Sequence, residues 1–492
     1  MNYKSVFYIL GRIFLVLGLL MLLPLSVDVY YNLNGFEEAP YRSFLIPIAL
    51  LFIFGGLLQL CKPKKLNIYA KDGFVICGLA WILISIFGAL PFVISGCIPS
   101  FIDAFFETAS GFSTTGASIL TEIHSLPKSI LFWRSFTHWI GGMGILSFLI
   151  AIIPKSHGNS MYIMKAEVPG PKAGKVSAKI SESARTLYII YFVMTLLEIV
   201  VLFFGSRIEG SNIRFFDSVV TAFATAGTGG FSVLNNSILG YNSAFTEWTI
   251  IIFMFLFGVN FNLYFYFITR NFKSVLKDEE FRAYVIINLL CVFLITLNVM
   301  NLYSNLGTAI RDCFFAVNTV MSTTGFCTAD FNNWPTFSRI LLVMLMFVGC
   351  SAGSTGGGMK VSRIVLYFKQ LVRDFGQMLR PNKVINIRMN GRTVEGNVMK
   401  GVNSYLVAYV ITLVVSIVLI SLNGFDTTST VTSVVSCMNN IGPGLEIVGP
   451  TGNYAAFSDF SKLVLSFDML AGRLELFPIL ILLAPNTWRK AK

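Results

Sequence analysis

The chain has 492 residues, of which 55% are hydrophobic and only 13% are charged, and its mean hydropathy is +0.71. This composition excludes a soluble domain and is typical of a polytopic membrane protein. The formal net charge of +12 belongs to short segments between apolar stretches, so no basic soluble domain remains that could bind nucleic acid.

Ten apolar segments are predicted to cross the membrane, because each is long enough for about 30 Å of hydrocarbon. They lie at 6–26, 43–61, 73–97, 130–153, 186–206, 246–269, 283–303, 340–368, 401–422 and 461–485. The first is interpreted as a retained helix and not as a signal peptide, because no convincing cleavage site follows it. Most of the 37 lysines and arginines fall on one side of this topology, which predicts that both termini are cytoplasmic and that the inner face contacts anionic lipid of the bilayer.

A short pattern, in which an Asp is followed by a glycine-bearing turn, occurs four times between pairs of long apolar segments. The four copies run from Asp103 to Gly116, from Asp217 to Gly230, from Asp312 to Gly325 and from Asp426 to Gly442. The first three share one spacing, and the fourth carries an insertion. Membrane transport folds are commonly assembled from such internal repeats. We therefore predict an all-α polytopic membrane protein with four hairpins around a central pore.

Each copy is predicted to form a half-helix that enters the membrane from outside, with its Asp as the N-cap residue. The C-terminal end of such a helix presents unpaired carbonyls and the negative end of the helix dipole at the pore centre, where they favour a cation. The glycine turn then aims backbone carbonyls inward to replace a lost hydration shell. The alternative is that Gly and Thr are small residues for close helix packing. Because the pattern occurs in four copies in register, we favour the interpretation that these turns line an ion pathway.

The sequence offers little for an enzyme. The eight cysteines fall mostly inside apolar spans and are interpreted as small core residues, and the three histidines are scattered. The glycine-rich segment 349–360 is not a phosphate loop, because Met359 stands where a Walker motif has Lys. The inner segment 155–185 is too short to fold a nucleotide-binding domain. We expect no enzymatic activity and no cofactor, and any nucleotide regulation needs a partner chain.

The four turns resemble the selectivity-filter strands of the Trk/Ktr/HKT superfamily of potassium transporters. The resemblance is carried by Ser113-Thr114-Thr115-Gly116-Ala117, Thr228-Gly229-Gly230-Phe231, Ser322-Thr323-Thr324-Gly325-Phe326 and Asn439-Asn440-Ile441-Gly442-Pro443. The segments WRSFTHWIGGMG at 133–144 and GRLE at 472–475 are similar to helices of the bacterial Trk membrane subunit. The resemblance implies that K⁺ binds backbone carbonyls of the filter residues Thr114, Thr115, Gly116, Thr228, Gly229, Gly230, Thr323, Thr324, Gly325, Asn440, Ile441 and Gly442.

The resemblance also implies an architecture and partners. It implies four pseudo-symmetric membrane–pore–membrane repeats, at 71–160, 161–275, 276–385 and 386–492, after an N-terminal pair of transmembrane helices at 1–70. The expected function is potassium uptake across the bacterial inner membrane. The expected partners are a second copy of the chain, which makes a homodimer in the membrane, and a cytosolic ring of nucleotide-binding regulatory subunits encoded elsewhere.

Two features below the filter are expected to gate the pathway. Arg473 lies near the middle of the final span, where a charge costs about 3 kcal/mol. It either faces the conduction path as a positive barrier, like its family counterpart, or pairs with Asp468 or Glu475. The second feature is a run with five glycines in ten residues, which disfavours continuous helix and is either a packing kink or, as the family suggests, an intramembrane gating loop. Its glycines are Gly349, Gly353, Gly356, Gly357 and Gly358.

The fourth turn departs from the other three, because Asn440 and Ile441 stand where the first and third turns have threonines. Each turn also has one filter glycine, so we expect weaker selectivity than in a tetrameric potassium channel. Glu446, just past the fourth turn, either enriches cations at the outer mouth or is simply solvated. The rival function is a sodium-permeable or poorly selective monovalent cation transporter, although glycine in all four turns favours potassium. Channel-like flow and symport with protons or sodium both fit the sequence.

Overall fold

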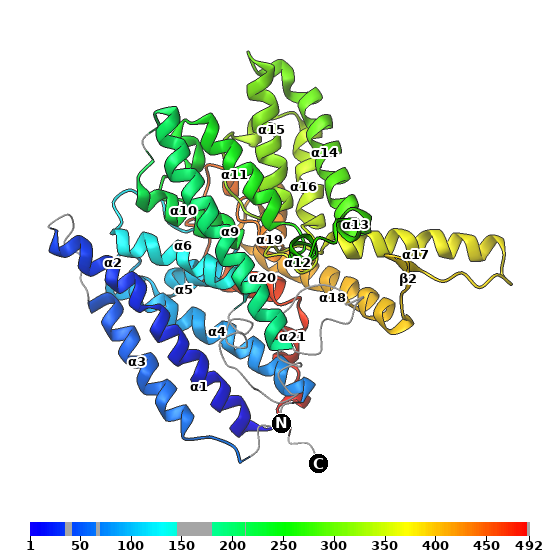
Figure 1. Cartoon of the computed structure of the whole chain (residues 1–492). Helices are drawn as coiled ribbons and strands as arrows, with labels where there is room; N and C mark the ends of the chain where they lie inside the picture. The colour runs from blue at the N-terminus through cyan, green and yellow to red at the C-terminus, as the bar shows by residue number, and fades with distance from the viewer. Residues whose placement is uncertain (35–41, 65–68, 145–179, 212, 490–492) are drawn as a thin grey trace.

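A computed structural model of the chain describes residues 1–34, 42–64, 69–144, 180–211 and 213–489. This described part is mostly helical (Figure 1), and its single small sheet pairs β1 (Arg388–Met389) antiparallel with β2 (Arg392–Thr393). Arg388 is the register partner of Thr393. The predicted all-α membrane fold is confirmed.

Four units of helix, pore helix and helix follow one another along the chain. They are α4 (Ala70–Ile94), α5 (Phe101–Phe112) and α6 (Lys128–Met143); α9 (Ile180–Glu209), α10 (Phe215–Gly227) and α11 (Ala244–Phe257); α14 (Glu279–Val299), α15 (Leu306–Met321) and α16 (Thr336–Val348); and α18 (Gly396–Ile420), α19 (Thr427–Met438) and α20 (Asp459–Arg473). The N-terminal helices α1 (Tyr3–Leu20), α2 (Leu22–Leu33) and α3 (Arg42–Gln59) precede them. The exact boundaries between the repeats stay a prediction.

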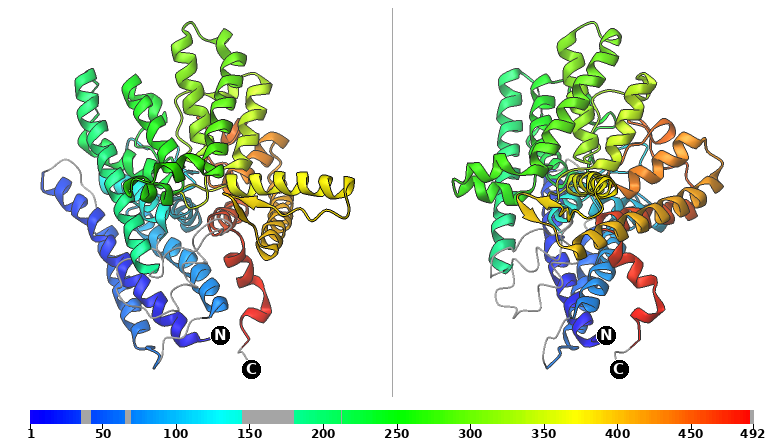
Figure 2. Two further views of the ribbon diagram at one scale, coloured as in Figure 1. Left: turned by 45° about the vertical axis from the view of Figure 1, so that its right-hand side comes forward. Right: turned by 90° about the vertical axis from the view of Figure 1, so that its right-hand side faces the viewer.

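The remaining elements are short helices and connections. Helices α12 (Phe261–Ile268) and α13 (Phe272–Lys277) follow α11, α17 (Val361–Leu379) leads toward the small sheet, and α21 (Phe477–Leu483) lies near the C-terminus. Single 3-10 turns lie at Ser237–Tyr241, Met300–Leu302, Phe331–Asn333, Ser421–Asn423, Glu446–Val448 and Pro485–Thr487. Helix α17 projects sideways from the body of the molecule, as Figure 2 shows.

Among the described residues, six helical segments are long and apolar enough to cross a membrane by themselves. They are Tyr3–Leu33, Arg42–Gln59, Ala70–Ile94, Ala184–Glu209, Glu279–Leu302 and Gly396–Asn423. The first reaches beyond the predicted 6–26. The second half of the predicted span 130–153 lies outside the described residues, as does most of the inner segment 155–185.

Three predicted spans are not continuous helices, and in one of them, 340–368, the break is the one that the glycine-rich run predicts. In the span 246–269, α11 and α12 meet at an angle of 92°. The span 340–368 is interrupted between α16 and α17 by the glycine-rich segment, where Gly349, Gly353 and Gly358 have φ of 68°, 72° and 76°. The span 461–485 is interrupted after α20, because Glu475 and Leu476 have φ of 57° and 66°. Backbone at positive φ cannot continue a right-handed helix, and such irregular backbone is tolerated at membrane depth only where it is buried or lines a pathway.

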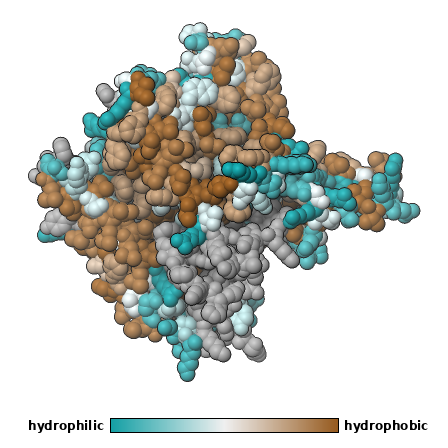
Figure 3. Space-filling view, viewed as in Figure 1, coloured by the Kyte–Doolittle hydropathy of each residue, from teal (hydrophilic) through white to brown (hydrophobic). Residues whose placement is uncertain are grey.

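The apolar side chains fall into two groups. One group packs the helices together, and its members, such as Phe44 of α3, Trp81 of α4 and Trp133 of α6, are buried. The other group faces outward and remains exposed on α9, α14 and α18, for example Phe293 of α14 and Val414 of α18. Figure 3 shows a broad hydrophobic surface over one face of the molecule. A surface of this kind suits a hydrocarbon environment.

Candidate ion pathway

Three of the four pore helices start differently from the sequence expectation. Asp426 is the N-cap of α19, as predicted, and accepts a hydrogen bond from the Ser429 N–H at 2.9 Å. The Ser429 side chain and backbone hold the pKa of Asp426 below its usual value. The other three Asp residues are not N-caps, and their predicted role is wrong.

Their positions have a physical reason. Asp103 and Asp217 lie in the first turns of α5 and α10, where the helix dipole favours a carboxylate. Asp312 lies inside α15, because that helix already begins at Leu306. Serine and asparagine take the N-cap of α5 and α15 instead, at Ser100 and Asn305.

All four turns share one unusual backbone conformation. The first residue of each turn has a left-handed φ, which is rare for residues other than glycine, and the glycine two residues later also has a positive φ. The first residues are Thr114 (58°), Thr228 (56°), Thr323 (59°) and Asn440 (56°), and the glycines are Gly116 (78°), Gly230 (74°), Gly325 (87°) and Gly442 (98°). The fourth turn therefore keeps the backbone of the other three although its side chains differ.

The four turns pack against one another in a closed ring. A Cβ added to any of the four glycines would lie too close to the backbone oxygen of the next turn along the chain. An added Cβ would lie 2.0 Å from Gly229 O at Gly116, 2.3 Å from Thr324 O at Gly230, 2.1 Å from Ile441 O at Gly325 and 2.6 Å from Thr115 O at Gly442. The last contact returns to the first turn, so the ring closes. Only glycine fits at these positions.

Side-chain hydrogen bonds hold the turns in shape. The hydroxyls of Ser113 and Thr115 lie 2.7 Å apart in the first turn, and those of Ser322 and Thr324 repeat this contact in the third. In the fourth turn, the Asn440 amide donates to Thr115 Oγ1 at 3.0 Å and so links the fourth turn to the first. Asn440, which differs from the threonine at this position in the other turns, therefore makes a contact between repeats four and one.

Two buried oxygens at the ring have no hydrogen-bond partner within the described residues. They are Thr114 Oγ1 and Asn440 Oδ1, and both residues are fully buried. A buried polar atom without a partner is costly. Hydroxyl and amide oxygens are of the type that can bind an alkali cation.

A buried ion pair that the sequence analysis missed supports the ring from behind. Arg134 of α6 donates to Glu107 of α5 at 2.8 Å, and the two side chains are 1% and 0% exposed. Arg134 also donates to the Ser232 backbone oxygen at 3.2 Å and lies over the Phe231 ring at 4.1 Å. Repeats one and two are thereby joined. The sequence did offer a signal for this pair, because Glu107 and Arg134 are the single Glu and the single Arg of two largely apolar helices.

His138 makes a second connection between repeats one and two. Its Nδ1 lies 2.7 Å from the Gly111 backbone oxygen, and its Nε2 accepts the Phe231 N–H at 3.3 Å. One ring nitrogen thus faces an acceptor while the other faces a donor, which is the pattern of a neutral imidazole carrying its proton on Nδ1. His138 is a structural link of the ring.

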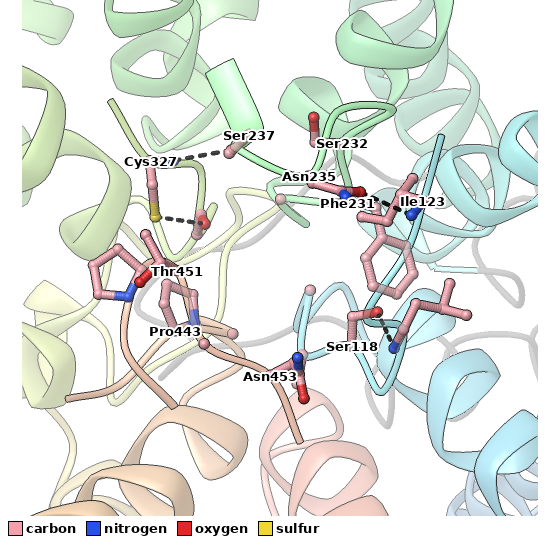
Figure 4. Close-up of a pocket in the computed structure, with 18 of the residues that line it drawn as sticks. Ser118, Ile123, Phe231, Ser232, Asn235, Ser237, Cys327, Pro443, Thr451 and Asn453 are labelled. Carbon is pink, nitrogen blue, oxygen red and sulfur yellow. Dashed lines mark hydrogen bonds between the residues drawn. The ribbon is translucent and has the colours of Figure 1, made fainter. Parts of the chain in front are cut away.

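A cavity of about 210 Å³ opens on one side of the ring. All four ring glycines line it, together with polar groups from the loops that follow each turn. Figure 4 shows Ser118, Phe231, Cys327 and Pro443 around this space, each from a different loop. Glu446 is not among the residues that line this cavity, and its carboxylate pairs with Arg339.

The glycine-rich loop 349–360 lies on the other side of the ring. The Gly357 N–H donates to Thr323 Oγ1 at 2.7 Å. A Cβ on Gly357 would lie 2.4 Å from Asn439 O, and one on Gly356 would lie 2.6 Å from Ser322 O. The ring therefore lies between the cavity and this loop. Of the predicted gating glycines, Gly356 and Gly357 lie directly against turns three and four, whereas Gly349 and Gly358 pack against each other and Gly353 packs near Asn260.

Arg473 of α20 joins this loop to a different repeat. Its guanidinium donates to Thr355 O at 2.5 Å, and to Gly141 O at 2.6 Å and Gly142 O at 2.5 Å at the end of α6. Neither acid considered as a partner is paired with it in the structure. Asp468 accepts a hydrogen bond from Ser416, and Glu475 pairs with Arg363 at 2.6 Å.

The described residues contain no group of three His, Cys, Asp or Glu that could hold a metal ion. The eight cysteines are all free, and six of them are buried. The polar atoms gathered at the ring are mainly backbone carbonyls and hydroxyls, which suit an alkali cation.

Comparisons with known proteins agree on one family. A family model named TrkH and described as a cation transport protein matches residues 41–490. The Trk system potassium uptake proteins TrkH of Salmonella typhimurium and of Escherichia coli are each 35% identical over 496 residues, which cover 100% of both chains. The crystal structure of the potassium transporter TrkH from Vibrio parahaemolyticus is similar, with a TM-score of 0.87 and 31% identity over 99% of this chain and 100% of that one.

Proposed function

The chain belongs to the TrkH family of cation transport proteins, and we propose that it conducts potassium into the bacterial cell through the ring of four turns. It is a multi-pass bacterial membrane protein, and its relatives are transporters, not enzymes. The observation that carries the proposal is the closed ring, in which each filter glycine lies against the backbone oxygen of the next turn.

The pathway starts in the cavity lined by the four glycines, which faces the outside. A potassium ion loses its water at the ring, because backbone carbonyls of the turns replace the hydration shell. The C-terminal ends of the four pore helices lie next to these turns and add negative potential. The step needs no covalent chemistry.

Below the ring, the loop 349–360 and Arg473 form the barrier. A unit positive charge about 6 Å from a passing ion repels it by about 3 kcal/mol at an effective dielectric of about 20. The contacts of Arg473 with Thr355, Gly141 and Gly142 fix this charge beside the loop. The barrier opens when the loop moves away from turns three and four.

The proposal also includes partners. The chain forms a homodimer in the membrane, and a cytosolic ring of nucleotide-binding subunits acts on its inner face, to which both termini belong. Pull-down from native membranes with a tagged chain is expected to recover a soluble, ring-forming partner whose nucleotide changes the flux. A response of the purified chain to nucleotide without any partner would contradict this part.

The test of the function is flux through the purified chain in proteoliposomes under an imposed membrane potential. We expect potassium and rubidium to pass at comparable rates and sodium to pass more slowly. Equal rates for sodium and potassium would favour the second candidate, a poorly selective monovalent cation transporter. That candidate is favoured by one observation, the replacement of the turn threonines by Asn440 and Ile441 in the fourth turn.

A further inference from the structure

A buried carboxylate outside the filter contacts both ends of the glycine-rich loop. Glu280 lies in the first turn of α14 and is 5% exposed. Its Oε1 accepts the Ala352 N–H at 2.6 Å and the Ser362 N–H at 3.0 Å. These two residues flank most of the loop, so one oxygen atom ties the start of the loop to its end.

The location offsets part of the cost of burying the Glu280 carboxylate. Glu280 lies at the N-terminus of α14, and Ser362 lies in the first turn of α17. The carboxylate therefore meets the positive ends of two helix dipoles. Helix α17 has no side-chain cap of its own, because its N-cap residue Lys360 makes no capping hydrogen bond. Glu280 supplies the missing acceptor from another helix.

The tip and the base of the loop are held by different side chains. The tip is held by Thr323 and by Arg473, which contact Gly357 and Thr355. Within the loop, the buried Lys360 ammonium donates to the Gly356 oxygen. At the base, Glu280 makes the charge-assisted contacts, and hydrogen bonds to a charged group are roughly twice as strong as neutral ones.

We propose that Glu280 is a positioning residue that holds the glycine-rich loop closed across the pathway. Release of the Ala352 and Ser362 N–H groups removes the side-chain link between the two ends of the loop and leaves neutral backbone contacts, such as Val361 N–H to Cys350 O at 3.0 Å and Ser351 N–H to Gly258 O at 3.1 Å. With the charge-assisted contacts gone, the loop can leave turns three and four more readily. The inference rests on the proposed function, because it takes the loop as the barrier. It adds α14, a helix of the third repeat, to the elements that set the barrier.

The experiment compares Glu280→Gln and Glu280→Ala with Glu279→Gln in the full-length chain. Glu279 is the neighbouring residue in the same helix turn, and its partly exposed carboxylate pairs with Lys369 of α17. It therefore controls for the loss of one charge and one α14–α17 contact. Each variant is reconstituted in proteoliposomes, and rubidium uptake is measured without any partner protein.

A second readout follows the loop without using transport. Cys350 lies in the loop and is fully buried. Its alkylation by N-ethylmaleimide in the native chain, quantified by mass spectrometry of its own peptide, reports opening of the loop. A residue that acted only on overall stability would raise the alkylation of the buried Cys77 and Cys437 as well.

We expect Glu280→Ala to raise both basal uptake and Cys350 alkylation about tenfold, since at least one charge-assisted hydrogen bond is lost. Glu280→Gln keeps an acceptor without its charge, so we expect about a threefold rise in both. Glu279→Gln is expected to match the parent chain. If the Ala variant does not fold, uptake and Cys350 alkylation in the Gln variant test the proposal.

Two results would overturn the inference. Unchanged Cys350 alkylation in both Glu280 variants would show that Glu280 does not hold the loop. Faster alkylation of Cys350 with unchanged uptake would show that Glu280 holds the loop but that the loop is not the barrier. That second result contradicts the barrier of the proposed function and leaves the potassium pathway through the ring untouched.

Discussion

The ring that we propose as the filter and the loop that we propose as the gate are built in opposite ways. The ring uses backbone and glycine, and it repeats one conformation four times. The proposed gate uses charged side chains, and among the described residues it is built from Arg473, Glu280 and the glycine-rich loop of the third repeat. Selectivity needs equal ligands around an ion, whereas control needs an asymmetric contact that can be broken. The two halves should therefore respond differently to substitution.

The largest effect is expected behind the ring, for Arg134→Met. This change leaves Glu107 as a buried charge without its partner, which costs about 3–5 kcal/mol. We expect a much lower melting temperature in detergent. The control is Arg339→Met, which removes the more exposed Arg339–Glu446 pair, and exposed pairs contribute about 0–1 kcal/mol. Equal losses in both variants would mean that the buried pair does not support the ring.

The next effect is expected at the gate, for Arg473→Ala. Removal of a repulsion of about 3 kcal/mol raises basal potassium flux by up to about a hundredfold, and the retained hydrogen-bond contacts of the loop reduce the gain. The matched variant Arg473→Lys keeps the charge and is expected to stay close to the parent. The ratio of potassium to sodium flux should not change in either variant. An Ala variant that inserts normally and conducts no faster than the parent would make Arg473 purely structural.

A smaller effect is expected in the ring, for Gly116→Ser. A side chain at positive φ costs about 1–3 kcal/mol, and here it also meets the Gly229 oxygen. We expect the potassium-to-sodium flux ratio to fall about tenfold. Gly96→Ser is the control, because Gly96 has a nearly identical φ of 76° but no atom within 4 Å of an added Cβ. An unchanged ratio for Ser at Gly116, Gly230 and Gly325 would refute the filter assignment.

The smallest effect is expected at the contact between the two regions, for Thr323→Ala. This change removes the acceptor of the Gly357 N–H, and a typical hydrogen bond contributes about 0.5–1.5 kcal/mol. We expect basal flux to rise a few-fold with little change in selectivity. Thr323→Ser keeps the hydroxyl and should behave like the parent. A loss of selectivity in Thr323→Ala with unchanged basal flux would place this contact in the filter instead of the gate.

The same contrast explains what the sequence could predict. The four turns were predictable because repetition is visible along the chain and glycine marks unusual backbone. The contacts of Glu107, Arg134 and Glu280 were not predictable, because each joins segments far apart in sequence. The N-cap assignment of Asp312 was wrong because α15 begins at Leu306, and the helix start is set by Asn305 instead of the repeated Asp.

The central claim is that potassium passes through the ring of four turns, and the most direct test is to locate a heavier analogue of the ion. Crystals of the full chain grown with rubidium would be examined by anomalous diffraction. We expect a rubidium peak on the ring axis, enclosed by the turns at Thr115, Gly229, Thr324 and Ile441, and its loss when sodium replaces rubidium. An empty ring with rubidium bound elsewhere in the membrane region would contradict the account.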